Sequence, residues 1–269
     1  MNHAAARRRR VGGPPALLVV LGGLGLALFA VPVLALVARI PWSRLPELLV
    51  GDVVGDALRI SLVASLAATG ISALLGVPLA WLLARVEFPG RSVVRGFVTL
   101  PLVLPPVVGG AALLFALGRT GLVGGPIYRA TGFILPFSIW GVIVATTFVA
   151  MPFLVITLEG ALRGMDVRYE GAAATLGAGR WTVMRRVTLP MVAPSLIAGL
   201  VLTWARALGE FGATITFAGN LQGRTQTLPL AVFVALESDR DAAVALSLIM
   251  VAVSLTVLIA LRERWWHTL

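Results

Sequence analysis

The side chains best placed to do chemistry in this 269-residue sequence form a polar run within an apolar stretch. Arg206 and Glu210 are four residues apart, which on a helix places opposite charges on one face. The polar groups of Thr214, Thr216 and Asn220 follow, among several glycines. Hydroxyls, backbone N–H groups and helix N-termini can bind an oxyanion without a charged side chain buried in the membrane. This pattern could therefore line an anion path; the alternative is a local ion pair followed by helix-packing threonines.

A pair of prolines lies in an earlier apolar stretch, with glycines close behind it. Pro105 and Pro106 are followed by Gly109 and Gly110. Proline removes a backbone donor and kinks or breaks a helix. We expect these residues to break a membrane helix and to expose backbone groups along the same path. Glu210 would repel an anion rather than bind it. Its candidate functional role, beside the local ion pair, is therefore a gate or a subunit contact.

The composition excludes most enzymatic chemistry. All 22 basic residues are arginine, and the chain contains neither lysine nor cysteine. A P-loop lysine, a thiolate nucleophile and a cysteine-ligated metal are therefore absent. The two histidines, His3 and His267, lie near the ends of the sequence, and no aspartate stands in the middle of an apolar run. We predict no catalytic residue, no metal site and no cofactor bound by this chain, because an intramembrane enzyme or an ion-coupled carrier needs buried titratable groups.

Membrane helices must position these side chains. Of all residues 58% are hydrophobic and 13% are charged, and the mean hydropathy is +0.95, whereas soluble domains carry about 25% charged residues. Six runs without charged residues are long enough to cross a bilayer, which takes about 20 residues of helix. They cover residues 16–38, 60–84, 96–118, 130–158, 187–205 and 242–261. The predicted fold class is an all-α integral membrane protein with six transmembrane helices.

The arginines assign the two sides of the membrane. Fourteen lie on one side of the six spans and eight on the other, and the richer side is expected to be cytoplasmic. Both termini then face the cytoplasm, and the net charge of +10 fits a membrane surface rather than a nucleic-acid partner. The predicted organisation is a basic N-terminus (1–15), one transmembrane domain (16–262) and a cytoplasmic tail (263–269). Arg7–Arg10 could also begin a signal peptide, but the following apolar run is longer than usual, so a topology anchor is preferred.

The longest cytoplasmic connection is residues 159–186, and the coupling loop, which includes its exit, is residues 159–190. This loop has the pattern of two short helices. Asp166 can cap the first helix, which carries Ala172 and Ala173. Gly177 ends that helix in a turn, and a second helical stretch leads to Pro190 at the start of the fifth span. From composition alone, this loop could be an ordinary amphipathic connection with topology-setting arginines.

The stretch from Glu170 to Pro190 resembles the EAA loop of permeases from binding-protein-dependent type I ABC importers. Gly171 occupies the position of the usual glutamate, and Glu170 stands one position earlier. The positions that match the family pattern are Ala172, Ala173, Gly177, Leu189 and Pro190.

The resemblance implies a coupling helix that docks on a separate ATPase subunit, which would bind ATP and Mg²⁺. The residues implied in ATPase coupling are Glu170, Gly171, Ala172, Ala173, Leu176, Gly177 and Arg180. The resemblance further implies the type I transmembrane fold, a homodimer with a second copy, two ATPase subunits and an extracytoplasmic binding protein. This chain would be a transporter subunit without an ATPase site of its own.

The segment 205–230 is similar to that of molybdate permeases and, less closely, to that of sulfate permeases. Its core Leu-Gly-Glu-Phe-Gly-Ala, residues 208–213, is shared by both groups, whereas Arg-Thr-Gln-Thr-Leu-Pro-Leu at 224–230 is closer to the molybdate group. The resemblance implies import of molybdate, and of tungstate, across the bacterial cell membrane by ATP-driven alternating access; a sulfate or thiosulfate importer is the alternative. The residues expected along the path or at a gate are Pro105, Pro106, Gly109, Glu210, Thr214, Thr216 and Asn220.

Overall fold

The computed structural model describes residues 15–266, and all regular structure in that range is helical. Five helical stretches are long and apolar enough to cross a membrane. They are α1 (Ala16–Ala38), α3 (Asp52–Arg85), α7 (Ile139–Gly164), the continuous stretch Arg180–Leu208 and α13 (Arg240–Trp266). The predicted all-α membrane fold is thus confirmed, while the basic segment 1–14 and residues 267–269 of the tail lie outside the described residues.

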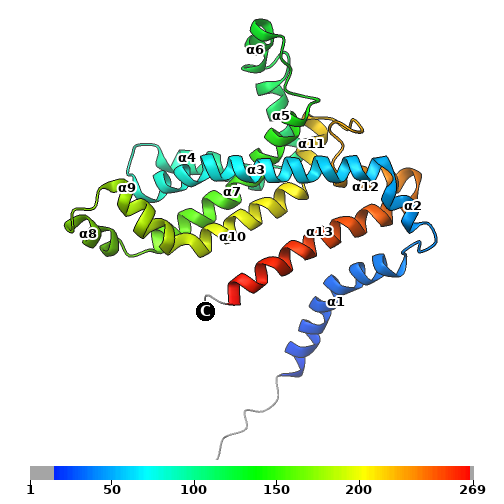
Figure 1. Ribbon diagram of the computed structural model, residues 1–269, viewed down its shortest axis with the longest axis horizontal. Coiled ribbons are helices and arrows are strands. Elements are labelled where there is room, and N and C mark those ends of the chain that lie inside the picture. Colours follow the sequence, from blue (N-terminus) through cyan, green and yellow to red (C-terminus); the bar gives the residue numbers. More distant parts are fainter. Residues whose placement is uncertain (1–14, 267–269) are drawn as a thin grey trace, which may run out of the picture.

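Shorter helices connect or extend these spans (Figure 1). They are α2 (Leu45–Val50), α4 (Arg91–Val103), α5 (Pro106–Leu117), α6 (Gly124–Thr131), α8 (Arg168–Thr175), α11 (Gly212–Phe217) and α12 (Leu228–Ser238). The stretch Arg180–Leu208 consists of α9 (Arg180–Val183), the π-helix η1 (Met184–Thr188) and α10 (Leu189–Leu208). Both α5 and α12 are apolar, but each is too short to cross a bilayer as one helix.

The third predicted span, residues 96–118, is two helices instead of one. Helix α4 ends at Val103, Leu104 has an extended backbone, and α5 begins at Pro106. A residue that precedes proline is disfavoured in the helical region, so Leu104 leaves it at Pro105. Figure 1 shows α4 along the bundle and α5 turning away from it, together with α6. The helix break expected from the two prolines is therefore present and changes the direction of the chain.

Helices α3, α7 and α10 form the central bundle of the protein (Figure 1). Small residues let them approach closely: Ala68, Ala150 and Ala207 are all buried in one cluster. A Cβ at Gly199 of α10 would lie 3.0 Å from a methyl carbon of Leu154 on α7. Close approach through small residues is a usual basis of helix association in lipid.

Helix α1 lies at the side of this bundle, next to α13 (Figure 1). None of its residues is buried, as expected for an apolar helix that faces lipid. The turn that follows α1 is fixed by Arg44, whose guanidinium pairs with Asp241 at 2.8 Å and Asp239 at 3.1 Å. The backbone N–H of Ala242 also donates to Asp239 and, with Arg44, lowers the pKa of that carboxyl group. These contacts join the loop after α1 to the connection between α12 and α13.

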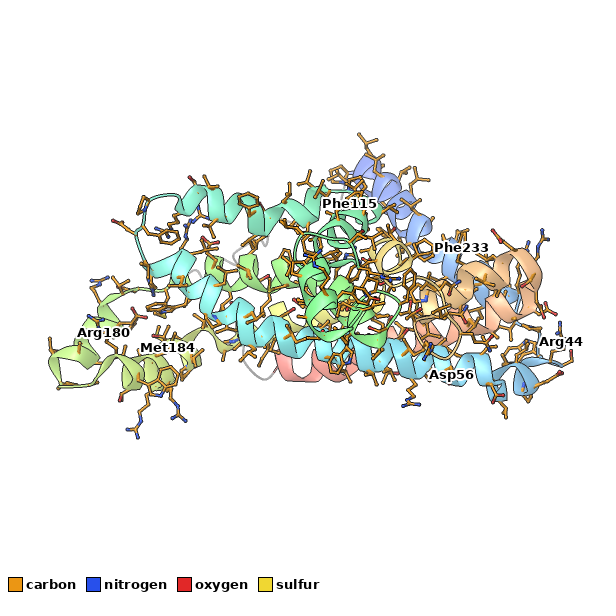
Figure 2. The ribbon with its side chains drawn as sticks, turned by 90° about the horizontal axis from the view of Figure 1, so that it is seen from above. Arg44, Asp56, Phe115, Arg180, Met184 and Phe233 are labelled. Carbon is orange, nitrogen blue, oxygen red and sulfur yellow. The ribbon has the colours of Figure 1, made fainter. Side chains whose placement is uncertain are left out.

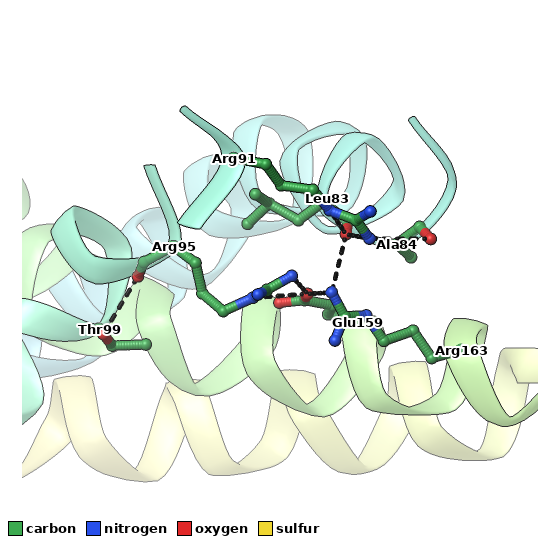
Figure 3. Close-up of polar contacts among 7 residues, drawn as sticks. All are labelled: Leu83, Ala84, Arg91, Arg95, Thr99, Glu159 and Arg163. Atoms are coloured by element: carbon green, nitrogen blue, oxygen red, sulfur yellow. Dashed lines mark hydrogen bonds and ion pairs between the residues drawn. The ribbon is translucent and has the colours of Figure 1, made fainter. Parts of the chain in front are cut away.

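A buried carboxylate joins α4 to α7 at the end of the bundle that carries α8 (Figure 3). Glu159 is 7% exposed and accepts hydrogen bonds from Nε and Nη2 of Arg95, at 2.9 and 2.7 Å. Arg163, one turn further along α7, pairs with the same oxygen at 2.9 Å. Arg91 and Arg163 also donate to the carbonyl of Leu83 near the end of α3. The group therefore fastens three helices together where the chain leaves the membrane.

Candidate functional site

The two segments predicted to line a path pack against each other. In α11, Gly212 lies so close to α5 that a Cβ there would be 2.9 Å from Cβ of Pro106. In α5, a Cβ at Gly110 would be 2.7 Å from the carbonyl oxygen of Ala213 and 2.8 Å from Cβ of Thr216. Glycine at both positions is therefore required by the close approach of the two short helices. We call this contact the α5–α11 junction.

The close packing at the centre of the junction can be tested by adding a side chain at Gly110. Replacing Gly110 with Val should destabilise the protein by about 1–3 kcal/mol, the usual cost of overpacking a close contact. Gly96→Val is the matched control, because Gly96 lies in α4 of the same interrupted span and a Cβ there meets nothing within 4 Å. Thermal unfolding of the two purified variants measures the difference. Equal melting temperatures would contradict the tight packing of the junction.

Glu210 connects the end of α10 to the start of α11. Its side chain is 1% exposed, and Oε2 lies 2.6 Å from Nη2 of Arg206, so the predicted ion pair is present. Its other oxygen accepts a hydrogen bond of 2.7 Å from the backbone N–H of Ala213. An acceptor at this place satisfies a donor of the first turn of α11, which has no partner within the helix. Glu210 is therefore both a member of a buried ion pair and the cap of a short helix.

The predicted polar residues of the path differ in what they contact. Thr216 donates to the carbonyl of Gly212 at 2.8 Å, so its hydroxyl is used within its own helix. The hydroxyl of Thr214 and the amide oxygen of Asn220 are buried and have no hydrogen-bond partner among the described residues. A buried polar atom without a partner costs about 1–3 kcal/mol, so such atoms point to a water or a ligand. Thr214 and Asn220 are thus the stronger candidates for a polar path.

Three serines on α3 were not predicted from the sequence as site residues. Ser61, Ser65 and Ser72 are all buried. The hydroxyl of Ser61 accepts a hydrogen bond of 2.7 Å from the backbone N–H of Leu228 at the start of α12, 167 residues away. The spacing of four and seven residues within an uncharged run is a signal for a polar stripe on one helix face. Through Ser61, this face of α3 contacts the start of α12.

The predicted coupling loop contains a short helix at one end of the molecule (Figure 1). Helix α8 begins at Arg168, whose backbone N–H donates to Asp166 at 2.9 Å, so the expected acidic cap is present. Hydrogen bonds from the side chain and backbone of Arg168 lower the pKa of Asp166. The turn after α8 needs Gly177, which has a φ of +83° that favours glycine.

The residues implied in coupling fall into two groups. Gly171, Ala172, Gly177 and Arg180 are exposed, Ala173 is half-buried, and Leu176 is 88% exposed. Small side chains beside an exposed leucine form a surface suited to close packing by a partner protein. In contrast, Glu170 faces inward: it accepts from the hydroxyl of Thr188 at 2.7 Å and pairs with Arg85 at 3.4 Å. Glu170 therefore anchors α8 to the ends of α3 and η1.

A π-helical turn lies between the coupling loop and the membrane part of α10. Over Met184–Thr188 the backbone follows the wider turn, and the N–H of Leu189 donates to the carbonyl of Met184. Such turns are rare and often occur at functional sites. Here the turn lies between α8, anchored through Thr188, and the helix that ends at the Arg206–Glu210 pair.

Interrupted membrane helices, a close junction of two short helices beside the bundle and an exposed helix of small residues at one end fit the membrane component of a transporter. Comparison with known families gives a more specific result. The profile of the family described as "Binding-protein-dependent transport system inner membrane component" matches residues 76–264. The chain belongs to this family and is an inner-membrane protein.

Curated relatives cover most of the chain. "Molybdenum transport system permease protein ModB" of Mycobacterium tuberculosis is 48% identical over 242 residues, which cover 89% of this chain and 90% of the relative. The protein of the same name from Escherichia coli K12 is 41% identical, covering 78% and 92%. "Sulfate transport system permease protein CysT" of the same organism is 34% identical, covering 83% and 81%.

Solved structures support the fold. A bacterial ABC transporter involved in the import of the acidic polysaccharide alginate matches with a TM-score of 0.72 and 20% sequence identity, covering 92% of this chain and 93% of that chain. At this level of identity the similarity shows the fold alone. The type I importer fold expected from the EAA loop is thereby confirmed.

Proposed function

We propose that this chain is the membrane-spanning subunit of an ABC importer that moves molybdate, and also tungstate, into the cytoplasm. The observation that carries the proposal is the 48% identity to a molybdenum transport permease over 89% of the chain. The lower identity of 34% to a sulfate permease favours molybdate over the alternative cargo. Molybdate and sulfate are both tetrahedral dianions, so the α5–α11 junction alone does not discriminate between them.

The proposed assembly contains two copies of the chain, two separate ATPase subunits and an extracytoplasmic molybdate-binding protein. One chain carries one coupling helix, α8, so a symmetric dimer would present two of them to two ATPases. The ATPases would bind ATP and Mg²⁺, since this sequence lacks a P-loop lysine. Closure of the ATPases would move α8, and the anchor of Glu170 on Arg85 and Thr188 would pass that movement to α3 and α10.

Metal content of cells tests the cargo. A strain in which the gene is deleted should lose molybdenum when grown at limiting molybdate, and the complemented strain should regain it. Excess sulfate in the medium should leave the result unchanged. Normal molybdenum content together with impaired sulfate uptake would favour the sulfate importer, provided that no other molybdate importer is expressed in the strain.

The turn after α8 tests the coupling assignment. Gly177→Arg should lower co-purification with the ATPase and molybdate uptake at least about tenfold, because a bulky charged group would block close packing at the docking surface. Gly90→Arg is the matched control: Gly90 has a φ of +84°, and a Cβ at either glycine meets nothing within 4 Å. The two variants carry the same backbone strain and the same added charge. An equal loss in both would mean that strain, and not docking, is the cause.

A further inference from the structure

A pocket opens at the end of the bundle opposite α8, and none of the predicted path residues lines it. It has a volume of about 490 Å³ and lies between α3, the start of α7 and the loop before α12. Figure 2 shows Asp56, one of its residues, toward the end marked by Arg44 and far from Arg180 of the coupling region. Its lining includes Asp56, Arg59, Val63, Ser138, Gly223 and Arg224.

Two arginines give the pocket its charge. Arg59 comes from α3 and Arg224 from the loop before α12, so they approach from different elements. Among the described residues, neither guanidinium has an acidic partner within 4.0 Å. Asp56 is the one carboxylate in the lining, which leaves the pocket with a net positive charge.

The start of α7 adds to this positive field. Ser138 lines the pocket and caps the 26-residue helix by accepting from the backbone N–H of Gly141 at 3.2 Å. The first N–H groups of a helix lack acceptors within it, and its dipole favours an anion there. Two guanidiniums and a long-helix N-terminus around one cavity are complementary to a small anion carrying two charges.

The carboxylate of Asp56 opposes this attraction. It faces the loop, since a Cβ at Gly223 would lie 3.2 Å from its Oδ2. A negative group in an anion site lowers the affinity, which suits a site that must release its ligand onward; conduction requires binding that is favourable but weak. The mixed charge therefore fits a transient receiving site rather than a storage site.

We propose that this pocket receives the tetrahedral oxyanion dianion on the outer face of the transporter before it enters the α5–α11 junction. The inference rests on the proposed function for the identity of the dianion. Arg59 and Arg224 bind the oxygens of the anion, the N-terminal end of α7 adds its positive field, and Asp56 limits the residence time. The hydroxyl of Ser138 donates to the carbonyl of Leu135 at 2.6 Å, so Ser138 holds the helix end in place rather than binding the anion.

The absence of cysteine from the sequence allows a direct measurement. Val63→Cys places one thiol in the pocket, and Val123→Cys is the matched control, because both valines are 47% exposed and Val123 is outside the pocket lining. The thiol introduced at position 63 is the pocket thiol, and the thiol introduced at position 123 is the control thiol. Spheroplasts that express the complete transporter, washed free of binding protein, are treated with an anionic or a cationic methanethiosulfonate reagent. The ratio of the two modification rates reports the local electrostatic potential.

The proposal expects an anionic-to-cationic rate ratio about tenfold higher at the pocket thiol than at the control thiol, in line with the local enrichment of counter-ions in a charged cleft. Adding Arg59→Gln or Arg224→Gln should lower the ratio at the pocket thiol, and adding Asp56→Asn should raise it. None of these changes should affect the control thiol. Millimolar molybdate should slow modification of the pocket thiol. A role of these residues in folding alone would not produce opposite effects from the arginines and the aspartate.

Several results would overturn the proposal: an unreactive pocket thiol, a ratio equal to that of the control thiol, no response to the charge changes, or protection by added binding protein but not by free molybdate. The last result would identify a protein-docking surface. Protection by sulfate with no effect of molybdate would support an anion site while contradicting the proposed cargo. The two failures are therefore distinguishable.

Discussion

Replacing Glu210 with Leu is expected to lower the free energy of unfolding by about 3 kcal/mol, the lower end of the range for breaking a buried ion pair. The lower end applies because Arg206, which loses its partner, remains 27% exposed and keeps some hydration. The same substitution removes the acceptor for the backbone N–H of Ala213 and so the cap of α11. Since α11 carries Thr214 and packs against α5, we also expect molybdate uptake to fall at least about tenfold, which corresponds to about 1.4 kcal/mol.

Two further variants separate the ion pair from the cap. Glu210→Gln keeps an oxygen that can accept from Ala213 and loses only the charge, so it should be less damaging than Glu210→Leu. The double variant Arg206→Leu with Glu210→Leu removes both charges and should recover part of the stability, because no unpaired charge is left in the bundle. Thermal unfolding of the purified permease measures all three. Equal stability of the single and double Leu variants would mean that the ion pair contributes little and that the cap dominates.

Local features of the fold could be predicted from the sequence because their causes are local. Pro105 and Pro106 act on the residues beside them, so the break at Leu104 follows from backbone sterics. Arg206 and Glu210 are one helical turn apart, so their pairing follows from helix geometry. The glycine turn at Gly177 follows in the same way from a conformation that favours glycine.

Contacts between distant parts of the chain could not be predicted in this way. Glu170 could be placed in the coupling loop, but its anchor on Arg85 joins residues 85 positions apart. Ser61 and the start of α12 are 167 positions apart. The pocket containing Arg59 and Arg224 likewise depends on how α3, α7 and a loop meet. One sequence carries no signal for such pairings, since each partner has a plausible local role alone.

One distant contact and one local pair lie at the two ends of a single helical stretch. At one end, Glu170 ties α8 to α3 and to the π-helical turn that leads into α10. Helix α10 ends at the Arg206–Glu210 pair, which caps α11 and so holds the α5–α11 junction. In the proposed mechanism, the route from the α8 surface to the α5–α11 junction is therefore one continuous helical stretch with a hydrogen-bonded anchor at each end.

A second route passes through Glu159, and it leads to the other prediction of large effect. Helix α7 leads to α8, which is the proposed coupling helix, and α4 leads to the break before α5, so the Arg95–Glu159 contact joins the two. Glu159→Gln should lower molybdate uptake at least about tenfold, corresponding to about 1.4 kcal/mol of lost coupling, while ATP hydrolysis by the complex changes less than about twofold. The reason is that α4 would no longer follow the movement of α7.

The two arginines around Glu159 allow this interpretation to be tested against general instability. Arg95→Gln should reproduce the uptake defect, because Arg95 makes two hydrogen bonds across helices to the 7%-exposed carboxylate. Arg163→Gln should have a smaller effect, since Arg163 is 45% exposed, pairs with Glu159 within its own helix and reaches α3 only through one long hydrogen bond of 3.4 Å to Leu83. Exposed pairs of this kind contribute about 0–1 kcal/mol. The double variant Arg95→Gln with Glu159→Gln should be no worse than either single variant. If Arg163→Gln instead caused the larger uncoupling, the joint between α4 and α7 would not transmit the movement, and α10 would remain as the route to the junction.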